Sequence, residues 1–293
     1  MARVTVNRFW QTFFGRGIVA TPEDLGIQGA QPTHPDLLNW LAAEFMESGW
    51  DVKHIHRLIV TSETYQQSAQ ATVQHLDMDP SNLWLARSPR YRLPSWMLRD
   101  QALAASGLLV PTLGGPPVRP YQPAGIWAEA TFGTKVYQLG KGDDLYRRSI
   151  YTFWRRIIGP TIFFDAAKRQ TCEVKPNRTN TPLHALTTLN DVTYVETARA
   201  LAERAMHQET AEQRVVWAFR TLLARHPSEH ETPILLRRLA EYVEYYREHP
   251  EMAEQLLSVG ESERSERLDS AEHAAYTAIA NTLMNLDELL VRP

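Results

Sequence analysis

Hydrophobic residues recur at helical spacing along most of this chain. A broad apolar face runs through residues 3–14, and Gly15 follows it as a natural stop. A second apolar stripe extends from Leu37 to Met46, and a third from Val52 to Ile59. The pattern predicts an N-terminal helix followed by a helical hairpin.

Polar residues mark where these helices begin. Thr33, with Asp36 three residues later, resembles a capping box and predicts a helix start. Asp51 is placed to cap the helix that follows it. Later in the chain, Thr210 and Ser228 each precede Gln or Glu at capping-box spacing.

The middle of the chain alternates between helical and irregular patterns. Residues 69–94 are polar and predict only a short turn near 83–85, whereas Ser95–Leu109 has helical spacing. Residues 111–127 hold Pro or Gly at nearly half their positions and predict an irregular loop. Long ordered loops often line sites.

The last third of the chain predicts a run of helices. Thr181 followed by Pro182 is a typical helix start, and the periodicity breaks near Asn190 and Asp191. Further helices are predicted at 210–224, 231–248, 251–258 and 270–290.

One stretch favours extended structure. Residues 145–154 are rich in aromatic and β-branched types and predict a strand, with Cys172–Lys175 as its partner. The predicted fold is therefore mainly α and multi-helical, with a small β element around residues 145–175.

Charge divides the chain unevenly. The net charge of −3 combines −1 over residues 1–144, +5 over 145–191 and −7 over 192–293. This predicts a helical part at 1–191 carrying the Arg-rich segment and an acidic helical bundle at 192–293, packed as one unit. The basic centre either packs against the acidic part or binds an anion, and both interpretations stay open.

The Arg-rich segment supplies the candidate binding residues. A guanidinium holds carboxylate, sulfate or phosphate bidentately and stacks on aromatic rings. The predicted anion site combines side chains of the segment with the helix start after Thr181; its members are Arg148, Arg156, Arg178, Asn180 and Thr181. The alternative is that these arginines bind backbone carbonyls and the acids of residues 192–293.

Catalytic candidates lie in the same stretch. His184 could act as general acid–base with Asp165 or Asp191 orienting it, and Cys172 is a candidate nucleophile. The ten histidines show no metal-ligand spacing, so no metal site is expected, and no cofactor is expected within this chain. No glycine-rich phosphate loop follows a strand.

Cysteine count and hydropathy limit the protein class. A single cysteine excludes an intrachain disulfide. No apolar run approaches the ~20 residues that cross a bilayer, so no membrane span is expected. The N-terminus lacks the pattern of a signal peptide. The acidic balance outside the basic segment argues against nucleic acid as a partner.

Several blocks of sequence resemble a known family. They include VNRFWQTFFGRGIVATPEDLGIQG, GGPPVRPYQPAGIW, YRRSIYTFWRR, RTNTPLHALTTLND and, near the end, NTLMNLDELLVRP. Together they are similar to domain-of-unknown-function family 1553, the C-terminal domain of large exported proteins in planctomycetes and related bacteria. Trp96 departs from the small or acidic residue that the family pattern would place there.

The resemblance implies a partner domain and a cellular location, but it implies no activity. Full-length relatives carry a planctomycete-type cytochrome c domain, so it implies a haem-containing partner domain and a periplasmic or envelope location. The leading hypothesis is an accessory binding module for an anionic small molecule or glycan. The alternative is a hydrolase-like enzyme acting on anionic or sulfated polysaccharide through His184.

Overall fold

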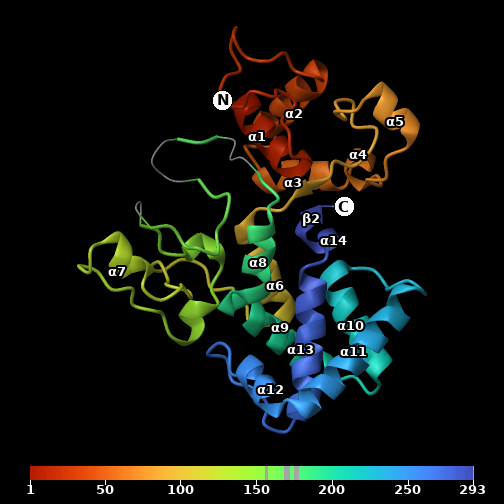
Figure 1. The fold of residues 1–293 in the computed structure, drawn as a ribbon. Helices are drawn as coiled ribbons and strands as arrows, with labels where there is room; N and C mark the ends of the chain where they lie inside the picture. Colours follow the sequence, from red (N-terminus) through yellow and green to blue (C-terminus); the bar gives the residue numbers. More distant parts are fainter. Residues whose placement is uncertain (156–157, 168–171, 175–177, 293) are drawn as a thin grey trace. The chain divides into compact units, whose positions relative to one another are not determined.

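The computed structural model describes residues 1–155, 158–167, 172–174 and 178–292. Within them are fourteen α-helices, two 3₁₀-helices and one two-stranded sheet, which confirms the mainly α prediction. The chain forms two compact units (Figure 1). Unit 1 comprises residues 1–92, 172–177 and 291–293, and unit 2 comprises 93–171 and 178–290. The predicted division at residues 191 and 192 falls inside unit 2.

Unit 1 is built on the predicted N-terminal helix and hairpin. Helices α1 (Ala2–Phe14), α2 (Pro35–Glu47) and α3 (Val52–Val60) bury one shared core. The helix α1 ends at Gly15, whose φ of 74° suits glycine. The buried side chains that the three helices contribute to this core include Val6, Trp10, Phe14, Leu38, Leu41, Phe45, Ile55 and Ile59.

The two predicted caps of the hairpin have different outcomes. The Asp51 carboxylate accepts a hydrogen bond from His54 N, at 3.1 Å, as predicted. The helix predicted here forms, but the capping box predicted at Thr33 is wrong, because α2 begins at Pro35 and no side chain caps it. Proline is preorganised for the first helical position and keeps the residue before it out of the helix. Thr33 donates instead to the Ile18 carbonyl oxygen.

The polar stretch after the hairpin holds more structure than predicted. Helix α4 (Glu63–Gln66) precedes this stretch, which contains α5 (Val73–Met78), and α5 starts at a capping box formed by Thr72 and His75. Strand β1 (Tyr91–Arg92) pairs antiparallel with β2 (Val291–Arg292). The Arg292 guanidinium donates to the carbonyls of Phe13 and Tyr65, so the chain's last strand is fixed to unit 1.

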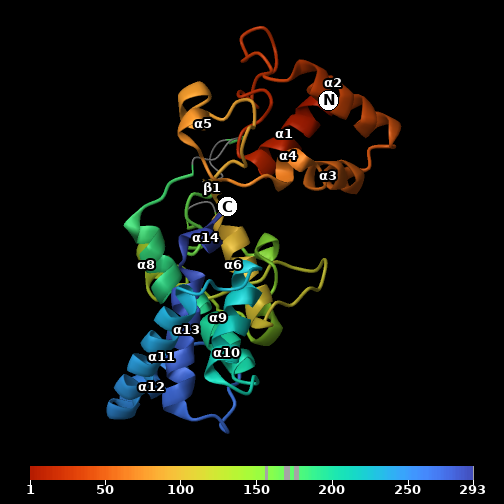
Figure 2. The same cartoon turned by 90° about the vertical axis from the view of Figure 1, so that its right-hand side faces the viewer.

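Unit 2 is a helical bundle around α9. Helix α9 (Val192–Ala205) is buried on nearly every side and lies between α13 (Ser270–Met284) and α6 (Ser95–Ser106) (Figure 2). The bundle consists of α6 (Ser95–Ser106), α8 (Pro182–Asn190), α9 (Val192–Ala205), α10 (Ala211–Leu223), α11 (Glu231–Glu248), α12 (Pro250–Leu257), α13 (Ser270–Met284) and α14 (Asp287–Leu290).

The sequence located most of these helices. The break near Asp191 is confirmed, since that residue ends α8 and caps α9 through Thr193 N. The capping box of Thr210 and Gln213 forms as predicted. The helix predicted at 270–290 is interrupted, because α13 ends at Met284 and α14 begins at Asp287.

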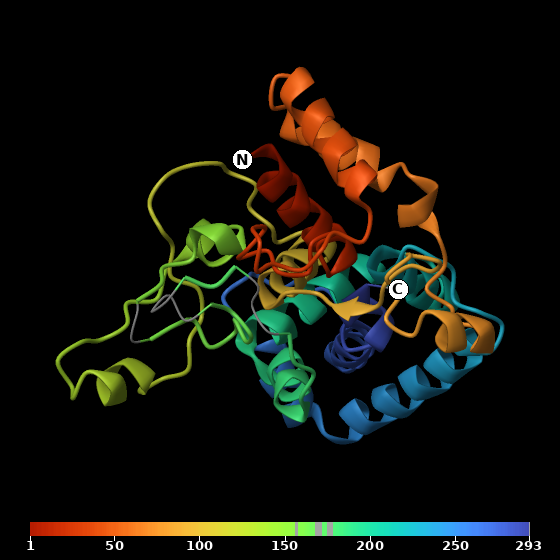
Figure 3. The same cartoon turned by 90° about the horizontal axis from the view of Figure 1, so that it is seen from above.

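Residues 110–155 and 158–165 form an irregular segment of unit 2 (Figure 3). It contains α7 (Ile126–Ala130), which the sequence did not predict, and the 3₁₀-helices η1 (Gly142–Leu145) and η2 (Ser149–Tyr151). The strand predicted at 145–154 is wrong. Among the described residues, that stretch makes only isolated bridges with residues 110 and 118, because η2 interrupts it. The segment around residues 110–118 is also rich in proline, which has no N–H to donate to a strand ladder. Of its predicted partner, 172–174 is not a strand and Lys175 lies outside the described residues.

Arg225 joins three helices at one end of the bundle, and this gives a pH-dependence prediction. Its guanidinium binds Glu231 at 2.8 Å and Glu288 at 2.7 Å. The hydrogen bond from Arg225 lowers the pKa of Glu231 from 4.5 to about 2. A depressed carboxyl pKa contributes stability above the unfolded pKa that is lost as pH falls through the folded one.

We therefore expect Glu231→Gln to lower the free energy of unfolding by about 0.5–1 kcal/mol at pH 7, since the pair is partly exposed. The deficit should shrink as pH falls from about 4.5 toward about 2. Urea unfolding of both proteins across that range measures it, with the exposed Glu229→Gln as control. A deficit that stays constant with pH would contradict the assignment.

Candidate functional site

The arginines of the central segment serve different purposes. Arg147 is buried, and it donates to the carbonyl oxygens of Thr112 (3.0 Å), Gly114 and Pro116 (3.3 Å). Its guanidinium also lies 4.1 Å from the Tyr151 ring centroid. Arg147 therefore holds the proline-rich loop in place.

The predicted anion-site residues are spread over this segment and the start of α8. Arg148 is exposed, and no hydrogen bond or ion pair joins its side chain to another described residue. Arg178 and Asn180 are exposed, and Thr181 is the N-terminal cap position of α8. Arg156 lies outside the described residues.

Three of the four catalytic candidates have structural partners. The buried His184 ring stacks on Phe164, with centroids 4.1 Å apart. The Asp165 carboxylate accepts from Thr179 N (2.6 Å) and Thr179 Oγ1 (2.8 Å). Asp191 caps α9, and burial raises the pKa of its carboxyl. Cys172 is a free, exposed thiol.

A pocket in the irregular segment brings cations and aromatic rings together. The bridge between Val118 and Thr152 aligns two chain segments, with Phe153 N donating to the Val118 carbonyl oxygen at 2.7 Å. This places Arg119 beside Phe153, its guanidinium 4.9 Å from the ring centroid. The pocket, here named the cation–aromatic pocket, encloses about 180 Å³ and is lined by Arg119, Trp127, Lys135, Val136, Tyr137, Gln138 and Phe153.

Three aromatic side chains shape this pocket. The Trp127 ring lies 5.3 Å from the Tyr137 ring and 6.0 Å from the Phe153 ring, centroid to centroid. The Trp127 Nε1–H donates to Gln122 Oε1 at 2.6 Å, and the Tyr137 hydroxyl donates to the Pro120 carbonyl at 2.6 Å. These bonds fix the orientation of the rings. A rigid apolar wall with a few polar groups is typical of a small-molecule site.

The charge around the pocket is positive and uncompensated. Arg119 and Lys135 line it, and the Arg155 guanidinium lies 5.6 Å from the Trp127 centroid. Among the described residues, none of these three cations pairs with a carboxylate. Burial raises the pKa of Tyr137 to about 12, so its hydroxyl stays neutral at pH 7. The arrangement can bind an anionic group on a ligand with an apolar face.

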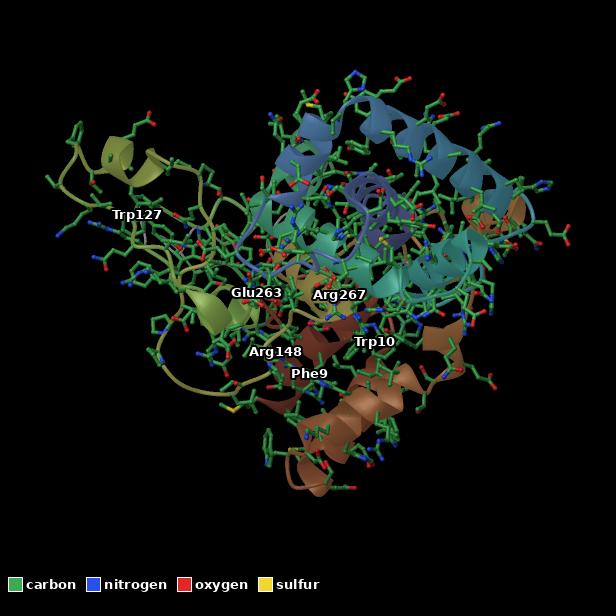
Figure 4. The ribbon with its side chains drawn as sticks, turned by 90° about the horizontal axis from the view of Figure 1, so that it is seen from below. Phe9, Trp10, Trp127, Arg148, Glu263 and Arg267 are labelled. Carbon is green, nitrogen blue, oxygen red and sulfur yellow. The ribbon has the colours of Figure 1, made fainter. Side chains whose placement is uncertain are left out.

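The pocket differs from the site predicted from sequence. Both use arginines among aromatic residues, but Figure 4 shows Trp127 and Arg148 well apart on unit 2. The only sequence feature that pointed to the pocket was the long proline-rich loop, because long ordered loops often line binding sites. The role of Arg119 was not predicted, because a single arginine in a loop has no pattern to mark it.

A second polar cluster is buried within the bundle, and sequence reasoning missed it as well. Glu196, on α9, is 1% exposed, and its Oε1 accepts from Tyr146 Oη (2.8 Å) and Ser262 N (2.6 Å). Arg199, one turn later, lies 3.8 Å from the same oxygen and donates to the Ser262 carbonyl at 2.6 Å. The pairing of Glu and Arg at i and i+3 on a fully buried helix is the signal that marks such a cluster.

The loop between α12 and α13 is shaped around this cluster. Gly260 has a φ of 89°, and a Cβ there would lie 2.2 Å from the Glu196 carboxyl carbon. Burial, followed by the hydrogen bond to Glu196, raises the pKa of Tyr146. The cluster is closed to ligands and ties the loop to the bundle.

Within the described residues, no group of three His, Cys, Asp or Glu side chains is arranged to hold a metal ion. Nor does that part of the chain contain a helix long and apolar enough to cross a bilayer.

Comparison with known protein families gives a match over most of the chain. The model of the family described as "PSD1: Protein of unknown function (DUF1553)" matches residues 1–239. No curated protein matches the chain, and no solved structure matches it.

Proposed function

Since this chain belongs to the DUF1553 family of proteins of unknown function, we propose a function from its own chemistry: unit 2 binds an anionic ligand in the cation–aromatic pocket. The observation that carries the proposal is a set of three cations that pair with no carboxylate among the described residues: Arg119 and Arg155 lie over aromatic rings, and Lys135 lines the pocket. Such cations remain available to a ligand.

The pocket's size and walls favour a particular class of anion. A volume of about 180 Å³ corresponds to about six water molecules at ~30 Å³ each. That space suits one sugar-sized ring with its acidic group. The faces of Trp127 and Phe153 offer apolar contact, and Arg119 offers a planar fork for carboxylate or sulfate. We propose an acidic or sulfated glycan as the ligand.

We also propose a cellular location and a neighbouring domain for this binding module. The resemblance to exported planctomycete proteins supports an accessory module in the periplasm or cell envelope, next to a cytochrome c domain that carries the haem. Within this chain, no residue is assigned to a cofactor.

Calorimetry with acidic and neutral oligosaccharides of equal length tests the proposal. We expect oligogalacturonate or a sulfated oligosaccharide to bind at low salt, to bind more weakly at raised salt, and the neutral sugar not to bind. Arg119→Gln should weaken binding about 10–100-fold, since a hydrogen bond to a charged group contributes about 1.5–3 kcal/mol. Trp127→Ala should weaken it as well.

Two matched variants locate the site. Arg237 is exposed on α11 and has no described partner, so Arg237→Gln should leave the affinity unchanged. Arg148→Gln should also leave it unchanged, whereas a loss there would place the anion at the site predicted from sequence. Absence of acidic-glycan binding by the folded protein at low salt would refute the proposed function.

A further inference from the structure

A larger groove lies among three helices of unit 2. Helices α10, α11 and α13 pack on one another (Figure 1), and between them is a groove of about 690 Å³. We name it the three-helix groove; it is lined by Ala211, Arg214, Leu236, Leu239, Ala240, Val243, Glu244, Arg247, Glu248, Glu272 and Tyr276. It shares no residue with the cation–aromatic pocket.

The floor of the groove is apolar and follows one helical face. Leu236, Ala240 and Val243 recur at three- and four-residue spacing along α11, and Tyr276 from α13 completes the floor. A second helix can pack on such a face with its own apolar side chains at positions i, i+3, i+4 and i+7. The floor is therefore suited to the apolar face of an amphipathic helix.

The charges around the floor are unbalanced. Arg214 and Arg247 both lie beside Glu272, at 3.6 and 3.7 Å, so one carboxylate engages both arginines. Glu244 and Glu248, four residues apart on α11, are exposed and have no cationic partner among the described residues. The chain from residue 192 onward also carries a net charge of −7. The unpaired charge at the rim is therefore negative.

We propose that the three-helix groove docks a basic amphipathic helix of a partner protein. Its apolar face would pack on Leu236, Ala240 and Val243, and its lysines or arginines would meet Glu244 and Glu248. Charge complementarity selects this occupant over an acidic helix, which would meet two uncompensated carboxylates. The proposal is independent of the anion site.

Fluorescence anisotropy with a synthetic peptide tests the proposal on the full chain. The probe is a labelled helix of about 15 residues made of leucine and lysine at helical period. We expect it to bind unit 2, and to bind less tightly as salt is raised. Two control peptides should bind at least about tenfold more weakly: one with the same composition in scrambled order, and one with glutamate in place of lysine.

Variants of the protein assign the binding to the groove. Ala240 is exposed in the groove, so Ala240→Trp should fill it and weaken peptide binding at least about tenfold. Ala185→Trp, on the exposed face of α8, is the matched control and should leave binding unchanged. The pair Glu244→Gln and Glu248→Gln should weaken binding and flatten its salt dependence.

Several results would overturn the proposal. The proposal fails if the basic amphipathic peptide does not bind, or if the scrambled or acidic peptide binds equally well. It also fails if the Ala240→Trp protein binds the basic peptide as tightly as the wild type does. Sedimentation decides a further alternative. A dimer that Ala240→Trp dissociates would assign the groove to a second copy of this chain and reject the partner helix.

Discussion

Replacing Glu196 by alanine is expected to lower the free energy of unfolding of unit 2 by about 3–5 kcal/mol. The carboxylate is 1% exposed, and its Oε1 accepts from Tyr146 Oη and Ser262 N. Without it, the guanidinium of Arg199 is a buried charge that has lost its carboxylate partner. Removing one member of a buried pair costs more than the pair contributes, because the remaining charge stays desolvated.

Two substitutions separate the charge of Glu196 from its hydrogen bonds. Glu196→Gln keeps an oxygen acceptor for Tyr146 and Ser262 and loses only the charge, so it should cost less than Glu196→Ala. Hydrogen exchange of α9 and α13 amides measures the effect, because these buried helices report the opening of unit 2 alone. The exposed Glu229→Ala is the control. A loss below about 1 kcal/mol for Glu196→Ala would show that the cluster is not a stability element.

The helices were the predictable part of the fold because their signals are local. Apolar periodicity and caps such as Asp51 and Thr210 act within a few residues, so the sequence alone places them. The short α5 and α7 were missed because neither is long enough to show a period, and α5 buries no residue. For these two helices the sequence offers only residue composition, which does not predict a helix.

The roles of the charged residues could not be predicted from the sequence, because they depend on backbone carbonyl oxygens that lie far away along the chain. Arg147 and Arg148 are adjacent and chemically identical, yet one binds three carbonyl oxygens of residues 112–116 and the other faces solvent. Which of them is buried depends on a loop that lies more than thirty residues earlier in the sequence. The candidate pocket has the same origin, since the bridge of Val118 and Thr152 brings Arg119 to Phe153.

We expect the geometry of the candidate pocket to depend on Arg99, which does not line it. Arg99 is 0% exposed, and its guanidinium donates to the carbonyls of Leu145 (2.7 Å) and Arg147 (2.9 Å). It also donates to Ser149 Oγ at 3.2 Å, while the neighbouring Asp100 accepts from Ser149 N at 2.8 Å. Residues 145–149 in turn hold the proline-rich loop through Arg147. We therefore expect the pocket residues to depend on this chain of arginine–carbonyl bonds.

We expect Arg99→Met to destabilise unit 2 by about 3–5 kcal/mol, because at least two buried carbonyls lose their donor at about 1–3 kcal/mol each. It should also accelerate hydrogen exchange in residues 110–118 and 145–151 and abolish acidic-glycan binding, although Arg99 does not line the pocket. Arg99→Lys keeps the charge and loses the fork, so it should give an intermediate result. Arg237→Met, at an exposed position, should change neither property. If Arg99→Met speeds exchange in these segments while glycan affinity stays at the wild-type value, the pocket does not depend on this scaffold and the ligand site must lie elsewhere.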